Sequence, residues 1–102
     1  MAFAMSPQLL DGCVLAVLSH GDAYGYILTQ QVKSRLDISE STLYPVLRRL
    51  QKEECLETYD RAIDGRNRRY YKITKTGRAQ LNLYRGEWRV YAQRISGILK
   101  EE

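Results

Sequence analysis

The stretch STLYPVLRRL, residues 41–50, decides how this sequence is interpreted. Its apolar residues recur at i, i+3, i+4 and i+7, which is the spacing of one face of an α-helix. These residues are Leu43, Val46, Leu47 and Leu50. Pro45 interrupts the pattern, and a proline inside a helix removes one backbone hydrogen bond. We therefore expect a helix from about residue 40 to 54, capped by Ser39, whose polar side carries an unusual proline and two arginines.

The outward side of this helix is polar and basic. It consists of Ser41, Pro45, Arg48 and Lys52, flanked by Thr42, Tyr44 and Arg49. It holds no large aliphatic residue and no acid, whereas a face that serves only solubility would normally mix both charges. Hydroxyls and a phenol suit phosphates, and Arg48 suits a base edge, so the pattern favours DNA binding. Pro45 either offers the compact apolar contact that a thymine methyl needs or is simply tolerated early in the helix.

Two further helices are expected before this one. Ser6 and Pro7 form a capped helix start. The apolar positions that follow are Leu10, Val14, Val17 and Leu18. Asp22 can cap a second helix that ends near Leu36, and a short break then leads to Ser39.

A hairpin and a long helix are expected after it. LETYDR (56–61) and RRYYKIT (68–74) read as strands, and Asp64-Gly65 between them is a strong hairpin turn signal. Thr74 caps the last helix, whose apolar and aromatic positions follow an a/d heptad spacing. These positions are Leu81, Tyr84, Trp88, Tyr91, Ile95 and Ile98.

This order of elements predicts a mainly α fold with a small β-hairpin. Three helices followed by a two-stranded hairpin are typical of a winged helix-turn-helix, in which the third helix reads DNA and the hairpin is the wing. We assign residues 1–74 to this DNA-binding domain and residues 75–102 to a C-terminal dimerisation helix.

Charge is concentrated in the predicted wing. Residues 60–75 hold six basic and two acidic side chains, so the formal net charge of +4 resides there. Such a strip suggests an anionic polymer as partner, although charge alone fits a solvated hairpin as well. Arg66, Arg68 and Arg69 follow the turn, and strand alternation allows at most two of them to reach one groove easily.

Several classes of protein are disfavoured. His20 is the only histidine, which leaves little to build a metal site or a His-dependent catalytic triad, and no nucleophile or glycine-rich phosphate motif is present. We therefore expect neither an enzyme nor a cofactor. Cys13 and Cys55 form no CxxC, and a buried thiol is the preferred interpretation of Cys13. No stretch approaches the ~20 apolar residues of a membrane span, and a cytoplasmic protein is expected.

Two segments resemble the PadR family of bacterial transcription regulators. STLYPVLRRLQKEECL (41–56) and GRNRRYYKITKTGRAQL (65–81) match its paired motifs in order, and Tyr24-Gly25-Tyr26 matches its Y-G-Y. The resemblance covers residues from about 10 to 80. It implies a homodimeric repressor that binds double-stranded DNA at a palindromic operator and is released by a small aromatic or drug-like ligand. The chain departs from the family pattern at Glu54, where glycine is usual, and at Ile27, where an acid is usual.

The heptad stripe suggests two expectations beyond DNA. A dimer interface is expected from Leu10, Val14, Val17, Leu81, Tyr84, Trp88, Tyr91, Ile95 and Ile98, with the first helix packed against the partner's last helix. A slot between two Trp88 rings, with Tyr84 and Tyr91 nearby, could hold a planar, preferably cationic ligand. The alternative is that these aromatics only pack the dimer. The rival function is a winged helix that binds protein rather than DNA, which would require an apolar patch on the third helix.

Overall fold

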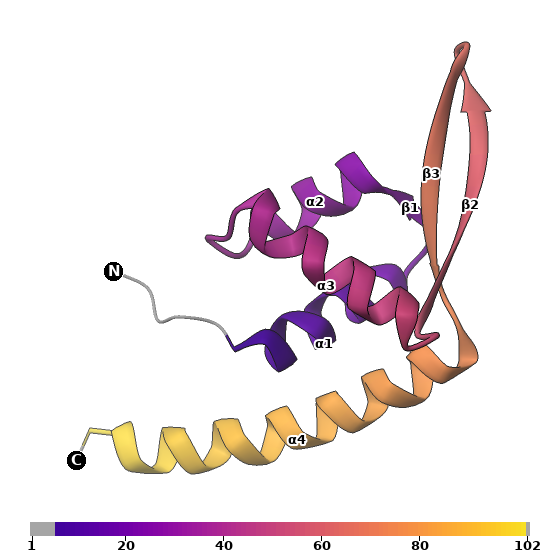
Figure 1. Ribbon diagram of the computed structural model, residues 1–102. Coiled ribbons are helices and arrows are strands. Elements are labelled where there is room, and N and C mark those ends of the chain that lie inside the picture. Colours follow the sequence, from indigo (N-terminus) through magenta and orange to yellow (C-terminus); the bar gives the residue numbers. More distant parts are fainter. Residues whose placement is uncertain (1–5, 102) are drawn as a thin grey trace.

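The computed structural model describes residues 6–101 and contains four helices and three strands (Figure 1). In chain order they are α1 (Pro7–Leu18), β1 (Ala23–Tyr24), α2 (Gly25–Lys33), α3 (Glu40–Lys52), β2 (Leu56–Ile63), β3 (Arg66–Ile73) and α4 (Lys75–Leu99). This is the predicted winged helix-turn-helix with a long C-terminal helix.

Three of the predicted helix starts are confirmed by their caps. The Ser6 hydroxyl accepts a hydrogen bond from the Leu9 amide at 3.2 Å, and Ser39 accepts from Thr42 at 3.3 Å. Thr74 accepts from Gly77 at 3.0 Å. Each cap satisfies one of the amides that the first turn of a helix leaves without a partner.

The second helix differs from its prediction at both ends. It begins at Gly25, because Ala23 and Tyr24 are not helical but pair with Tyr71 and Tyr70 of β3. It ends at Lys33, three residues earlier than expected. The antiparallel sheet therefore has three strands in the order β1-β3-β2. The hairpin turn is the predicted one: Asp64 and Gly65 have φ values of 52° and 74°, as a type I′ turn requires at both central positions.

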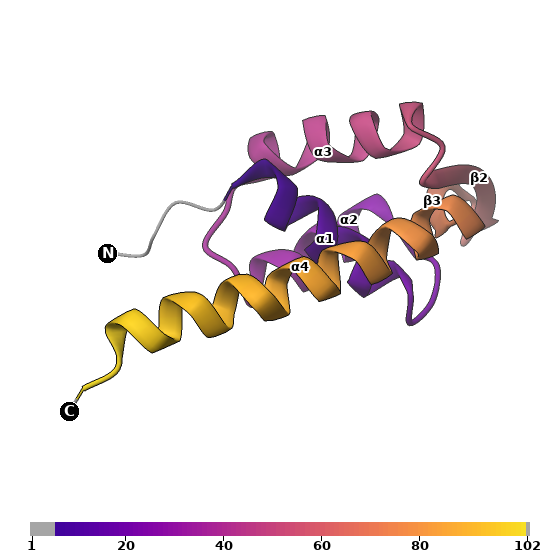
Figure 2. The ribbon, with the colours of Figure 1, turned by 90° about the horizontal axis from the view of Figure 1, so that it is seen from below.

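The helices form layers around one core. In Figure 2, α1 lies between α3 on one side and α4 on the other, and the hairpin stands at one end of this unit, while Figure 1 shows α2 on the side of the unit away from α4. The core is built mainly from leucines and valines of α1, α2 and α3, closed by β-strand residues and by Leu81 of α4. Helix α4 runs beneath the unit and its C-terminal half extends past it (Figure 1).

The end of α3 places Glu54, where glycine is usual in the family, in a strained backbone conformation. This residue has φ 64°, the left-handed conformation that favours glycine. The Glu54 amide bonds to the carbonyl of Gln51 at 3.0 Å, and the Cys55 amide bonds to that of Leu50 at 2.9 Å, which together form a Schellman motif. The helix itself ends at Lys52, slightly earlier than predicted.

Thr74 joins this helix end to the start of α4. Its hydroxyl donates to the carbonyl of Glu54 at 2.6 Å, and its amide donates to the carbonyl of Cys55 at 3.1 Å. The same hydroxyl caps α4. The wing therefore leaves and re-enters the body of the protein at one tightly bonded junction, which fixes its base relative to α3.

Candidate nucleic-acid interface

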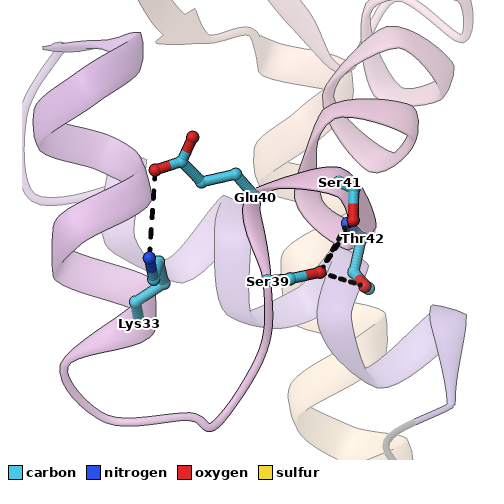
Figure 3. A network of polar contacts seen from close by, with 5 residues as sticks. All are labelled: Lys33, Ser39, Glu40, Ser41 and Thr42. Carbon is cyan, nitrogen blue, oxygen red and sulfur yellow. Dashed lines mark hydrogen bonds and ion pairs between the residues drawn. The ribbon is translucent and has the colours of Figure 1, made fainter.

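Hydroxyl groups organise the first turn of α3 (Figure 3). The Ser39 hydroxyl lies 2.9 Å from that of Ser41 and 3.0 Å from that of Thr42. On the other side of the turn, the Lys33 ammonium of α2 lies 3.8 Å from the Glu40 carboxylate. These contacts hold the α2–α3 turn and orient two of the predicted phosphate-contacting hydroxyls before any ligand arrives.

Six of the seven residues predicted on the outward face of α3 are exposed. We call them the reading face: Ser41, Thr42, Tyr44, Pro45, Arg48 and Lys52. Within residues 6–101 no hydrogen bond or ion pair engages the Arg48 guanidinium, so its donors are free for a ligand. Pro45 lies in the second turn of α3 and is exposed, a position that fits both interpretations of this residue.

The prediction that Arg49 flanks the outward, DNA-contacting face of α3 needs a correction. Its guanidinium turns inward and forms an ion pair with the buried carboxylate of Asp11 in α1. Arg49 sits at the boundary between the apolar and polar sides of α3, so either direction was open to its long side chain. Because that charge is engaged inside the protein, we remove Arg49 from the DNA-contacting set.

Asp11 is the centre of a small polar cluster. Its Oδ1 atom pairs with Arg49, and its Oδ2 atom accepts a long hydrogen bond of 3.4 Å from the Tyr84 hydroxyl of α4. Burial raises the pKa of Asp11 above its ordinary value, and the nearby Arg49 charge offsets only part of this effect. Burial also raises the pKa of Tyr84. Sequence patterns missed this cluster, since an acid in an apolar helix is normally expected at the surface.

The wing distributes its arginines over two faces. Cross-strand pairing places Arg68 opposite Arg61, and Arg69 opposite Asp60. The Arg69 guanidinium lies 3.6 Å from the Asp60 carboxylate. Arg66, beside the turn, is exposed. The predicted split of Arg68 and Arg69 is therefore confirmed, and Arg61 is a basic residue of the Arg68 face that the set of predicted DNA contacts omitted.

Tyrosines support the Arg68 face at its base. Tyr59 and Tyr70 stack with ring centroids 5.4 Å apart, and Tyr24 meets Tyr70 edge to face at 5.6 Å. The Arg68 guanidinium lies 4.4 Å from the Tyr24 ring centroid, within the range of a cation–π contact. The Tyr59 hydroxyl donates to Asp22 at 2.7 Å, and this bond raises the pKa of Tyr59. Arg68 is thus held in place, and Arg66 is the freest arginine of the wing.

Helix α4 has one apolar side that is covered only in its first half. Gly77 and Leu81 are buried, and Tyr84 is half-buried against the core. The same side then continues into exposed residues, which we call the α4 stripe: Trp88 (50% exposed), Tyr91 (57%), Ile95 (38%) and Ile98 (79%). The α4 stripe has no cover within the described chain.

This division corrects part of the predicted dimer interface. Leu10, Val14 and Leu81 are at most 3% exposed because α1 packs on the α4 of its own chain, so these three residues belong to the core of the single chain. Val17 is half-buried and packs against the same core. The predicted packing of α1 on a partner's α4 is therefore replaced, for these residues, by packing within one chain.

The predicted ligand residues are only partly brought together. The Trp88 and Tyr91 rings lie 6.3 Å apart, whereas the Tyr84 hydroxyl is directed to Asp11. A hollow flanks Trp88, and Tyr91 is not part of its lining. Its lining consists of Arg85, Trp88, Arg89, Ala92, Gln93 and Ser96. Two arginines and no acid in this lining oppose a cation there, so the expected cationic preference does not suit this flank of the ring.

Other chemistry has little support in the described residues. Burial raises the pKa of both Cys13 and Cys55, which keeps them as thiols. Residues 6–101 contain no group of His, Cys, Asp or Glu side chains placed to hold a metal ion. No helix in this range is both long and apolar enough to cross a membrane.

A helix-turn-helix with a basic reading face and an adjoining basic wing defines a winged-helix DNA-binding protein. Sequence comparison makes this more specific, since residues 14–83 match the PadR-like family of transcriptional regulators. Transcriptional regulator Rv3488 of Mycobacterium tuberculosis is 36% identical over 87 residues, which cover 81% of each chain. The protein belongs to the PadR-like family, and it is a DNA-binding regulator rather than an enzyme.

Solved structures agree with this assignment. The protein smu.1704 of Streptococcus mutans is similar over the full length of both chains, with a TM-score of 0.88 and 38% identity. A PadR-like transcriptional regulator of Bacillus cereus covers 92% of this chain and 94% of its own, with a TM-score of 0.83 and 33% identity. The long C-terminal helix is thus part of a fold that these relatives share.

Proposed function

We propose that this protein is a homodimeric repressor that binds a palindromic operator in double-stranded DNA and is released by a planar aromatic ligand. The observation that carries the proposal is the pairing of a free, basic reading face on α3 with an uncovered α4 stripe on the same chain. One surface suits a phosphate-lined groove and the other suits a second copy of the chain. We assign residues 1–74 to DNA binding and residues 75–102 to dimerisation, with the first turns of α4 completing the core.

The reading face supports contacts of two kinds. Ser41, Thr42, Tyr44 and Lys52 carry donors suited to phosphate oxygens, which position a protein on DNA. Arg48 lies between them with unengaged donors and suits a bidentate contact with guanine in the major groove. Arg66 at the wing suits phosphate or the adjacent minor groove, whereas Arg68 and Arg69 hold the wing's shape through Tyr24 and Asp60.

The α4 stripe supports the dimer. Trp88, Tyr91, Ile95 and Ile98 form an apolar surface along three turns, and contiguous exposed apolar surface of this kind marks an interaction site. A second copy related by a two-fold axis offers the same heptad spacing in return. Two reading helices would then address half-sites about 10 base pairs apart, or a multiple of that spacing.

The ligand is proposed at Trp88. Its ring is half exposed and flanked by a hollow, so pairing of two copies can leave aromatic surface open to a planar guest. Arg85 and Arg89 beside this hollow suit a neutral or anionic substituent there, and the Tyr91 side suits the π-face contacts of the guest. Release follows if the guest binds the DNA-free arrangement of the dimer more tightly than the DNA-bound one.

The test is selection of bound fragments from bacterial genomic DNA, followed by a mobility-shift titration of the selected site. We expect a palindromic site and binding that weakens steeply with salt. Light scattering on the same sample is expected to give twice the chain mass. A chain that remains monomeric, or that shifts no duplex even at low salt, would contradict the proposal. The latter result would favour a protein-interaction module.

A further inference from the structure

The carboxylate of Asp11 is shared by the reading helix and the C-terminal helix. Arg49 of α3 pairs with its Oδ1 atom, and the Tyr84 hydroxyl of α4 donates to its Oδ2 atom. Asp11 itself is 4% exposed and lies on α1, the helix that sits between α3 and α4 in Figure 2. Two elements with different proposed roles therefore meet at one buried charge.

The two partners of Asp11 cannot act independently. A buried carboxylate is costly unless it is paired and hydrogen-bonded, and loss of one partner leaves its charge poorly compensated. Any movement of Tyr84 away from Oδ2 therefore changes how strongly Asp11 holds Arg49. The converse holds for a movement of Arg49, because both bonds draw on the same charge.

Arg49 and Tyr84 each lie next to a residue with a proposed binding role, Arg48 for DNA and Trp88 for the ligand. Arg49 follows directly after Arg48 of the reading face, so a change in the α3 backbone at Arg49 would also displace Arg48. Tyr84 lies one turn before Trp88 on the same side of α4, so a guest or a partner chain that presses on the α4 stripe acts next to Tyr84.

We propose that Asp11 couples the α4 stripe to the reading helix. Arg49 is a positioning residue that sets the orientation of α3, and Tyr84 is the contact through which the state of the α4 stripe alters that orientation. This inference rests on the proposed function, since it describes how occupancy at Trp88 reaches Arg48. It assigns roles to Asp11, Arg49 and Tyr84 that do not require any of them to touch DNA or ligand.

Reciprocity makes the coupling measurable without knowing the effector. If the state of α4 changes DNA affinity, DNA binding must change the state of α4 to the same extent in free energy. Trp88 is the only tryptophan of the chain and lies on α4. Its fluorescence therefore reports on the α4 stripe when DNA binds at α3.

The experiment follows Trp88 emission while a duplex of about 30 base pairs, three helical turns long, is added at low salt. DNA affinity is measured in parallel by mobility shift. In the wild-type protein we expect the Trp88 emission to change as the duplex saturates. In Tyr84→Phe we expect most of this change to disappear while DNA affinity falls by no more than about twofold, since only one weak hydrogen bond is lost.

Tyr91→Phe is the matched control. It removes a phenolic hydroxyl from the same side of α4 but leaves Asp11 untouched, so the emission change should persist. Arg49→Met should lose the emission change and also bind DNA more weakly, and Arg49→Lys should restore part of both. The inference is overturned if Tyr84→Phe responds like the wild type, or if the wild type binds the duplex with no emission change. A wild-type protein that binds no duplex overturns the proposed function instead, and the inference with it.

Discussion

The backbone of Gly77, in the first turn of α4, lies directly against the carbonyl oxygen of Cys55. A Cβ atom built on Gly77 would overlap that oxygen and would also lie only 2.8 Å from the Ile73 side chain. The oxygen belongs to the backbone and accepts a hydrogen bond from the Thr74 amide, so it cannot easily move aside. The close approach brings α4 onto the base of the wing.

Gly77→Ala is therefore expected to destabilise the protein strongly. Overpacking against rigid groups costs about 1–3 kcal/mol and occasionally more. Gly86→Ala is the control, because a Cβ atom there meets nothing within 4 Å and alanine favours a helix interior by about 0.5–1 kcal/mol. Urea denaturation should lower the midpoint for the first variant and raise it for the second. Equal effects would show that the Cys55 contact does not matter.

Glu54→Gly is expected to stabilise the protein. Glu54 adopts a left-handed conformation at φ 64°, which glycine adopts without the steric cost of a side chain, on the order of 1 kcal/mol. Glu53 has an ordinary φ of −83°, so Glu53→Gly should instead lower the free energy of unfolding. Thermal unfolding of the two variants under identical conditions tests the opposite signs. A loss of stability in Glu54→Gly would mean that the Glu54 side chain makes a contribution larger than the strain.

Arg48 and Arg66 should differ in how they affect DNA binding. Arg48→Ala should cost about 1–3 kcal/mol at the operator and relax sequence preference, as expected for a lost bidentate base contact. Arg66→Ala should weaken operator and random duplex alike and reduce the salt dependence by about one phosphate contact. Titrations at several salt concentrations distinguish the two patterns. Unchanged operator affinity in Arg48→Ala would rule out this residue as the reader.

Trp88 should be required for ligand binding. A planar aromatic dye that enters the proposed slot should quench the Trp88 fluorescence. Trp88→Ala should lose dye binding, measured by dye anisotropy, while DNA binding persists as long as the dimer does. Trp88→Phe keeps a flat ring and should retain part of the affinity. If no member of a dye panel alters the fluorescence of the wild-type protein, the aromatic residues serve dimer packing alone.

Asp11 should give stability an unusual dependence on pH. Because burial raises its pKa in the folded protein above the ordinary 3.8, Asp11 holds its proton more tightly in the folded protein than in the unfolded chain. Its contribution to stability is complete below the unfolded pKa and is lost as the pH rises through the folded pKa. Asp11→Asn cannot lose a proton, so wild-type stability relative to this variant should fall as the pH rises from the unfolded pKa, about 3.8, through the folded pKa. A relative stability that rises over this interval would show that Arg49 outweighs burial.

Local signals explain what could be predicted from the sequence. The apolar spacing of α3, the caps at Ser6, Ser39 and Thr74, and the Asp64-Gly65 turn each depend on residues close together in the chain. At Glu54, where glycine is usual in the family, the sequence allows either a different helix end or a strained left-handed residue, and the structure has the latter. The reading face could be recognised since it lies on one side of one helix.

Long-range relationships explain what could not be predicted. Ala23 and Tyr24 form a strand only because β3 pairs with them, and nothing in their local pattern shows it. The inward turn of Arg49 depends on Asp11, 38 residues away. A heptad pattern of apolar residues also does not show whether the stripe packs within its own chain or against a partner chain. The apolar pattern alone therefore predicts Leu10, Val14 and Leu81 at a dimer interface, whereas the structure buries them in the core of the single chain.

The uneven cover of α4 has a consequence for folding. From Arg85 to the end of the helix every residue except Gly86 and Ala92 is exposed, so these last turns receive little support from the body of the chain. An isolated helix of about 15 residues is marginal in water. The backbone amides of these last turns of α4 should therefore exchange hydrogen quickly in dilute protein. Their exchange should slow as the concentration rises and the proposed dimer forms, while the amides of α1 and α3 stay protected throughout. In the proposed dimer, the last turns of α4 would gain the cover that the single chain does not give them.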